Sequence, residues 1–151
     1  MESFQQFMSA WEDLLQASPV NSIYLTPQWQ QVWWDYFGGN REMAGFYVHE
    51  SGSLMAVASM SKQGGEVTFT GEPETFDYND FLVRPGFETA FFPRLLDELQ
   101  LDDVKSITLC SLKEGSPTLM YLPDVAKTYG FVATVTEEDV APGLELPETW
   151  E

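Results

Sequence analysis

Residues 76–99 constrain the fold most, because a strand pattern and a helix pattern meet there at one sharp corner. Aromatic and branched residues favour an extended strand over residues 78–83. Pro85 lacks a backbone N–H and Gly86 tolerates a tight turn, so the strand is expected to end there. Apolar residues then recur at three- and four-residue steps, which predicts an amphipathic helix over residues 87–99. A strand that leads directly into a helix indicates a sheet covered by helices.

Hydrophobic periodicity elsewhere predicts further helices over residues 3–17, 27–37 and 117–129. Thr26 and Ser116 each precede a proline, the expected order of an N-cap and a first helical residue. Strands are expected over residues 45–50, 54–61, 67–70, 105–110 and 131–136, with turns at residues 51–53 and 64–65. This order predicts an α/β fold of the α+β kind, in which about four helices flank a mixed sheet with an antiparallel first half.

Length and charge limit the class of protein. The 151 residues are 44% hydrophobic, enough for a single domain over residues 1–151. The net charge of −17 disfavours nucleic acid, anionic membranes and polyphosphates as ligands and favours a basic partner. Cys110 is the single cysteine, so an internal disulfide is excluded and a reducing compartment fits. Without a signal-peptide pattern or a long apolar run, we expect a cytoplasmic protein with no membrane span.

Four segments of the chain resemble a known family in order and spacing. They are SIYLTPQWQQVWWDYFGG (22–39), FDYNDFLVRPG (76–86), LKEGSPTLMYL (112–122) and EEDVAPGLELPETWE (137–151). Together they resemble the N-terminal half of GNAT-type acetyltransferases of the BioF2-like and CelD types, relatives of the FemAB aminoacyl transferases. The resemblance covers roughly residues 22–151. It implies a GNAT-like mixed sheet. It also implies a partner for this domain, namely a second, C-terminal GNAT-like domain that would hold the acyl-CoA or aminoacyl donor.

The corner at residues 84–90 lies where the resemblance places the acyl-CoA loop of GNAT enzymes. That loop needs several glycines, so that consecutive backbone N–H groups can approach a pyrophosphate. Here Gly86 stands alone beside Arg84, Pro85 removes one donor, and Glu88 adds a negative charge. We therefore expect a degenerate loop, with no cofactor bound by this domain.

Four acidic residues lie just before the corner: Glu72, Glu74, Asp77 and Asp80. Such a cluster can supply a general base, hold an amine substrate or bind a hard cation weakly. Its spacing fits no cation-loop template, so no metal site is expected. The alternative is a solvated turn over residues 73–79 that Asp80 caps or orders. If the cluster is functional, the candidate catalytic residues are Asp77, Tyr78 and Asp80, because the family resemblance is densest there.

Aromatic residues supply the candidates for partner binding. Trp33 and Trp34 are neighbours on a predicted helix and point about 100° apart, so at most one can face the core fully. The other is expected to contact a partner, together with Trp150. Cys110 and His49 can be interpreted as a nucleophile pair or, more simply, as a buried thiol and an ordinary strand histidine.

Three functional hypotheses follow. In the first, the chain is the N-terminal GNAT-like domain of an acyl- or aminoacyl-transferase; it shapes an acceptor cleft and is inactive alone. In the second, it is a noncatalytic acidic module that docks a basic domain or chain. In the third, it is a small, self-sufficient acetyltransferase with an unusual donor loop.

Overall fold

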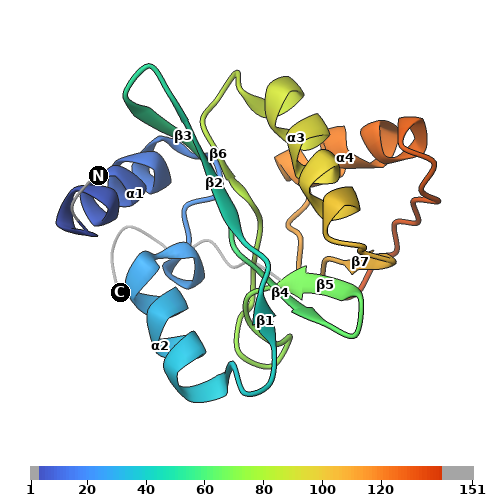
Figure 1. Ribbon diagram of the computed structural model, residues 1–151, viewed down its shortest axis with the longest axis horizontal. Helices are drawn as coiled ribbons and strands as arrows, with labels where there is room; N and C mark the ends of the chain where they lie inside the picture. Colours follow the sequence, from blue (N-terminus) through green and yellow to red (C-terminus); the bar gives the residue numbers. More distant parts are fainter. Residues whose placement is uncertain (1–3, 141–151) are drawn as a thin grey trace, which may run out of the picture.

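The computed structural model describes residues 4–140, which fold as a mixed α+β structure (Figure 1). Its helices are α1 (Phe4–Ala17), the 3-10 helix η1 (Ile23–Leu25), α2 (Pro27–Phe37), α3 (Glu88–Leu101) and α4 (Pro117–Thr128). Its strands are β1 (Glu42–Met43), β2 (Phe46–Glu50), β3 (Ser53–Ala58), β4 (Met60–Gln63), β5 (Glu66–Phe69), β6 (Leu82–Val83) and β7 (Ser106–Thr108). The predicted fold class is confirmed. None of the helices in these residues is long and apolar enough to cross a membrane.

One long hairpin joins the two sheets, whose strand orders are β1-β4-β5-β7 and β2-β3-β6. β1 and β2 form one arm and β3 and β4 the other, and all of their pairings are antiparallel, as predicted for the first half. Ser59 interrupts the second arm, while Ala44 N still donates to Met60 O at 3.1 Å. A Cβ at Gly45 would lie 2.6 Å from the carbonyl oxygen of Ala58, so the close approach of the two arms requires glycine.

Two short turns close these hairpins, as the sequence predicts. Between β2 and β3, Ser51 and Gly52 adopt φ values of 50° and 81°. Between β4 and β5, Gly64 and Gly65 adopt φ values of 61° and 89°. Two successive residues with positive φ match the right-handed twist of the flanking strands, which is why glycine-rich pairs favour such turns.

The second half of the chain adds a parallel strand through a helical crossover. β5 pairs with β7 in parallel, with Val67 opposite Ile107, and α3 lies in the chain between these strands. On the way to α3 the chain forms β6, which pairs with β3. The sheet containing β7 is therefore mixed, as predicted.

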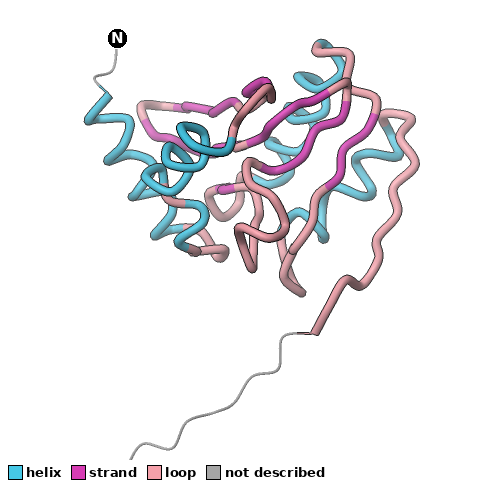
Figure 2. Tube along the Cα trace, turned by 90° about the horizontal axis from the view of Figure 1, so that it is seen from below, coloured by secondary structure: helices cyan, strands magenta, loops and turns pink. Residues whose placement is uncertain are grey.

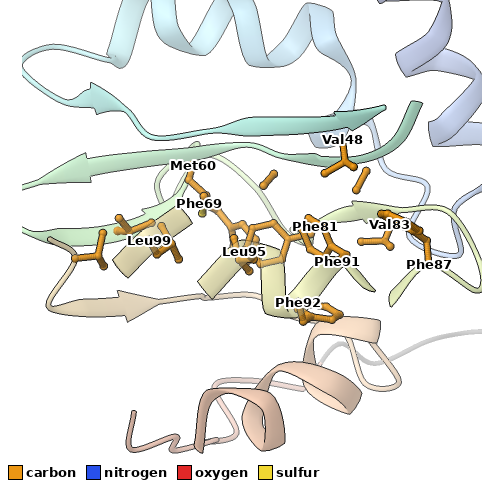
Figure 3. Packing of buried hydrophobic residues seen from close by; sticks show 14 residues of the cluster. Val48, Met60, Phe69, Phe81, Val83, Phe87, Phe91, Phe92, Leu95 and Leu99 are labelled. Atoms are coloured by element: carbon orange, nitrogen blue, oxygen red, sulfur yellow. The ribbon is translucent and has the colours of Figure 1, made fainter. Parts of the chain in front are cut away.

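Helices cover both faces of the sheets (Figure 1). α1 lies on one face, where Leu14 packs with Leu54 and Leu82. α3 lies on the other face, backed by α4. There Phe81 packs against Phe91, with ring centres 5.6 Å apart (Figure 3). The alternation of Phe81 and Leu82 between the two faces follows from the two-residue period of an extended strand.

Two predicted strands need correction. The strand expected over residues 78–83 is reduced to Leu82–Val83. Asp80 N donates to Asn79 Oδ1 at 2.9 Å and Phe81 N donates to Asp80 Oδ1 at 2.8 Å, so side chains replace the sheet partners of this backbone. The strand expected over residues 131–136 is absent, and Figure 2 draws this segment as a loop. Within the described residues no strand pairs with this segment, and Val132 in it is 94% exposed. β-branched residues favour a strand only where neighbouring strands pack against them.

Candidate functional site

Asp80 connects the segments at residues 76–86 and 112–122. Its Oδ2 accepts a hydrogen bond from Ser116 Oγ at 2.5 Å, and its Oδ1 accepts one from the Thr118 hydroxyl group. Both partners lie at the start of α4, 36 and 38 residues further along the chain. The carboxylate therefore links the N-terminus of α4 to the segment that leads into β6 by hydrogen bonds.

The local sequence explains why this connection forms. Ser116 is the N-cap of α4, and its Oγ accepts from Thr118 N at 3.1 Å, so its own proton is left to donate to Asp80. Asp80 is only 4% exposed, and this burial raises the pKa of its carboxyl group. Hydrogen bonds from Ser116, Thr118 and the Phe81 backbone act in the opposite direction and partly offset the shift. With both oxygens accepting hydrogen bonds, Asp80 holds Ser116, Thr118 and the Phe81 backbone in place.

A second connection brings in the segment at residues 22–39. The hydroxyl group of Tyr24 donates to Asp77 Oδ2 at 2.7 Å, and this hydrogen bond is the main cause of a raised pKa at Tyr24. Tyr24 also packs edge-on against Trp29 at 5.7 Å. Segments that begin more than 50 residues apart in sequence therefore meet at residues 77–80.

A small cleft of about 110 Å³ opens at this meeting point. It is lined by Pro19, Val20, Asn21, Ser22, Leu25, Tyr78, Asn79, Asp80 and Lys113. Tyr78 is 40% exposed, and Lys113 Nζ lies 5.9 Å from the centre of its ring, within reach of a cation–π interaction. Asn79 is buried and donates to Thr70 O at 3.3 Å. The exposed polar residues of the lining are therefore Asn21, Tyr78 and Lys113, of which Lys113 alone carries a charge.

Sequence reasoning singled out Tyr78 but not Lys113. A usable signal was present, because Lys113 lies inside the resemblance segment 112–122 and is one of only seven basic residues in the chain. What the sequence alone does not reveal is that this lysine reaches the ring of a tyrosine 35 positions earlier.

The acidic residues before the corner do not act as one group. Glu72 forms an ion pair with Arg41 at 2.8 Å, Asp77 accepts from Tyr24, and Asp80 is held by α4. Glu74 is exposed. Over residues 4–140, no three histidine, cysteine, aspartate or glutamate side chains are placed to share a metal ion.

The backbone donors of the corner before α3 are engaged by groups of the protein itself. Gly86 has a φ of +87°, and its N–H donates to Glu88 Oε2 at 2.8 Å, so a carboxylate of the protein occupies this donor. Phe87 N donates to Arg84 O at 2.9 Å. The guanidinium group of Arg84 donates twice to Leu54 O on β3, at 3.3 Å each. Arg84 thus holds the corner against the sheet, while the bond between Gly86 and Glu88 closes the corner locally.

The candidate partner-binding tryptophans differ in burial. Trp33 is 2% exposed, so its ring belongs to the interior and offers no surface to a partner. Trp34 is half-buried, with its ring 5.2 Å from that of Trp33 and folded against Gly38. The two side chains leave the helix about 100° apart, so only one of them can face the core fully, and here it is Trp33. Trp150 lies outside the described residues.

Cys110 and His49 lie in different environments. Cys110 follows β7 and is half-buried, and burial together with Glu138 raises the pKa of its thiol. His49 is an exposed residue of β2 and lies beside Tyr47, with ring centres 5.4 Å apart. A raised pKa keeps the thiol protonated at neutral pH, which is the opposite of what a nucleophilic cysteine requires.

Comparisons of the chain with protein-family models, with curated proteins and with solved structures return no match. The cleft at Tyr78 and Lys113 is therefore interpreted from its own chemistry.

Proposed function

We propose that this chain is the acceptor-side domain of an acyl- or aminoacyl-transferase, in which a second GNAT-like domain supplies the donor. The observation that carries the proposal is the connection through Asp80. It joins the segments at residues 76–86 and 112–122 and leaves Tyr78 and Lys113 beside one cleft. Segments that resemble one family and also meet in space support a common site.

In this proposal the cleft binds and orients the acceptor. Tyr78 offers a hydroxyl group and an aromatic edge, and Lys113 offers a cation for a carboxylate or another electron-rich group of the acceptor. Asp80 serves as a positioning residue, because three donors already engage its oxygens. The acyl carbon would be presented by the second domain, so this domain contributes orientation to the reaction.

The corner at Gly86 supports this division of work. Its N–H is engaged by Glu88, and Arg84 is turned toward β3. A pyrophosphate at the start of α3 would have to displace a carboxylate and enter the field of a chain with a net charge of −17. Such a corner disfavours an anionic cofactor.

Calorimetric titration tests the donor side. The purified chain is titrated with acetyl-CoA and with a long-chain acyl-CoA at low and moderate salt, and we expect no saturable heat. Saturable binding in the micromolar range would overturn the proposed division and favour a self-sufficient acetyltransferase.

Kinetics of the domain combined with the chain that completes it test the acceptor side. We expect Tyr78→Phe and Lys113→Met to raise KM for the acceptor several-fold while KM for the acyl donor stays constant. Lys105→Met is the matched control, since Lys105 lies beside Gly65 at the far turn of β4 and β5. An unchanged acceptor KM in both cleft variants would contradict the role of the cleft.

The charge distribution favours a second candidate, a noncatalytic module that docks a basic partner. Four of the seven basic side chains already form ion pairs with carboxylates of the described residues: Arg41, Lys62, Arg94 and Lys127. The large excess of negative charge is therefore left to solvent or to a partner. Salt-sensitive binding to a basic chain, with no acyl transfer by the assembled pair, would favour this candidate.

A further inference from the structure

A groove separate from the cleft at Tyr78 lies between the end of α3 and the edge of the sheets. Its volume is about 340 Å³, and it is lined by Met43, Ala44, Gly45, Phe46, Glu98, Leu99, Leu101 and Asp102. This volume is at the small end of the range of about 300–1,000 Å³ that is typical of ligand pockets. It suits one or two anchoring side chains better than a whole cofactor.

Two large apolar side chains of the groove are exposed. Leu101 is 84% exposed and Met43 is 69% exposed, whereas Leu99, also in the lining, is buried with 2% exposed. Single exposed apolar residues are ordinary on protein surfaces. Two that share one groove form an apolar surface whose burial by a partner is favourable.

One wall of the groove is a sheet edge. Within the described residues, β1 and β2 are each the outermost strand of their sheets, so the arm from Glu42 to Glu50 has strand neighbours on one side only. Ala44 and Gly45 line this wall, and neither has a side chain larger than a methyl group. An extended segment can add to such an edge through main-chain hydrogen bonds.

The rim of the groove is negative. Lys62 forms an ion pair with Asp102 at 2.8 Å, and the negative charges of Glu42 and Asp103 add to that of Asp102 in raising the pKa of Lys62. Glu98 adds a fourth carboxylate in the lining. The end of α3 is the negative pole of the helix, and its last turn carries no basic residue. The local charge therefore favours a cationic ligand.

We infer that this groove docks an extended, basic segment of a partner protein, with apolar residues that cover Leu101 and Met43 and with lysine or arginine residues at the rim. The apolar anchors supply the affinity and the charges supply the selection and the rate of encounter. The inference is independent of the acceptor cleft, which lies beside η1 and Lys113.

Fluorescence anisotropy with two labelled probe peptides tests it. One peptide alternates leucine and lysine, and the other alternates serine and lysine with the same charge. We expect the leucine peptide to bind the full chain saturably and at least tenfold more tightly than the serine peptide. Equal binding of the two would overturn the inference, because it would show attraction by charge alone; absence of binding would overturn it as well.

Variants locate the binding site. Leu101→Ser is expected to lower the affinity for the leucine peptide at least tenfold. Glu98→Gln is expected to lower it several-fold at low salt. Val132→Ser is the matched control, since Val132 is also strongly exposed but lies beyond α4, and it should leave binding unchanged. These positions are exposed, so folding is preserved and circular dichroism verifies it. Equal effects of Leu101→Ser and Val132→Ser, or a dimer of the chain that Leu101→Ser abolishes, would overturn the inference of a basic partner.

Discussion

Ser116 donates a hydrogen bond of 2.5 Å to Asp80 although 36 residues separate them in the chain. This contact ties the N-cap of α4 to the segment before β6, and it places Lys113, three residues before Ser116, at the mouth of the cleft that Tyr78 also lines. The geometry of the proposed acceptor site thus depends on a buried polar contact that lies beneath it.

Removing the Asp80 carboxylate is expected to destabilise the protein. Asp80→Ala leaves the buried hydroxyl groups of Ser116 and Thr118 without their acceptor, which costs about 1–3 kcal/mol of the free energy of unfolding. Urea unfolding measures this loss. Glu74→Ala, at an exposed position of the same segment, should change the free energy by less than about 0.5 kcal/mol. Equal losses in the two variants would show that the contact with α4 contributes little.

The aromatic core predicts a strong contrast between two phenylalanines. Phe81 is 1% exposed and packs against Phe69, Phe91 and Phe92 (Figure 3). Phe81→Ala should lower the free energy of unfolding by about 3–5 kcal/mol, because a cavity remains where the ring was. Phe37, the last residue of α2, is 57% exposed, so Phe37→Ala should lower the free energy of unfolding far less. Similar midpoints of thermal unfolding for the two variants would contradict the packing described.

The close approach of the two arms of the long hairpin depends on Gly45. In Gly45→Ala the new methyl group meets the carbonyl oxygen of Ala58 at 2.6 Å unless the hairpin arms move apart, so we expect a loss of about 1–3 kcal/mol. Ser53→Ala, exposed on the same hairpin, is the control. Amide hydrogen exchange across β2 and β3 reports the separation of the arms, and unchanged protection in Gly45→Ala would refute the steric argument.

The thiol of Cys110 should react only at high pH. Burial, followed by the hydrogen bond and charge of Glu138, raises its pKa above the ordinary value, since both effects favour the neutral thiol. The rate of alkylation by iodoacetamide should therefore rise at higher pH than for a free cysteine. Glu138→Gln removes one negative charge and should shift this rise toward lower pH. A profile that does not move in Glu138→Gln would mean that burial alone sets the pKa.

Features that depend on near neighbours in the chain were predictable. The Thr26–Pro27 pair starts α2 at Pro27, and the helix ends at Phe37, both as expected from the sequence. The tight turns at residues 51–52 and 64–65 likewise follow from glycine and its tolerance of positive φ. Each of these features requires only residues within about four positions of one another.

Tertiary structure decided the rest, because burial and pairing depend on partners far along the chain. Residues 131–136 have the composition of a strand and yet form none, since β-branched residues need a neighbouring strand to pair with. Trp33 turned inward and Trp34 did not, a choice that depends on what covers α2. Asp80 lies in an acidic stretch, but its partners come from α4. The sequence by itself therefore determined the helices, the tight turns and most of the strands in their order, while long-range packing determined which further strands formed and which side chains were buried, paired or left at the cleft.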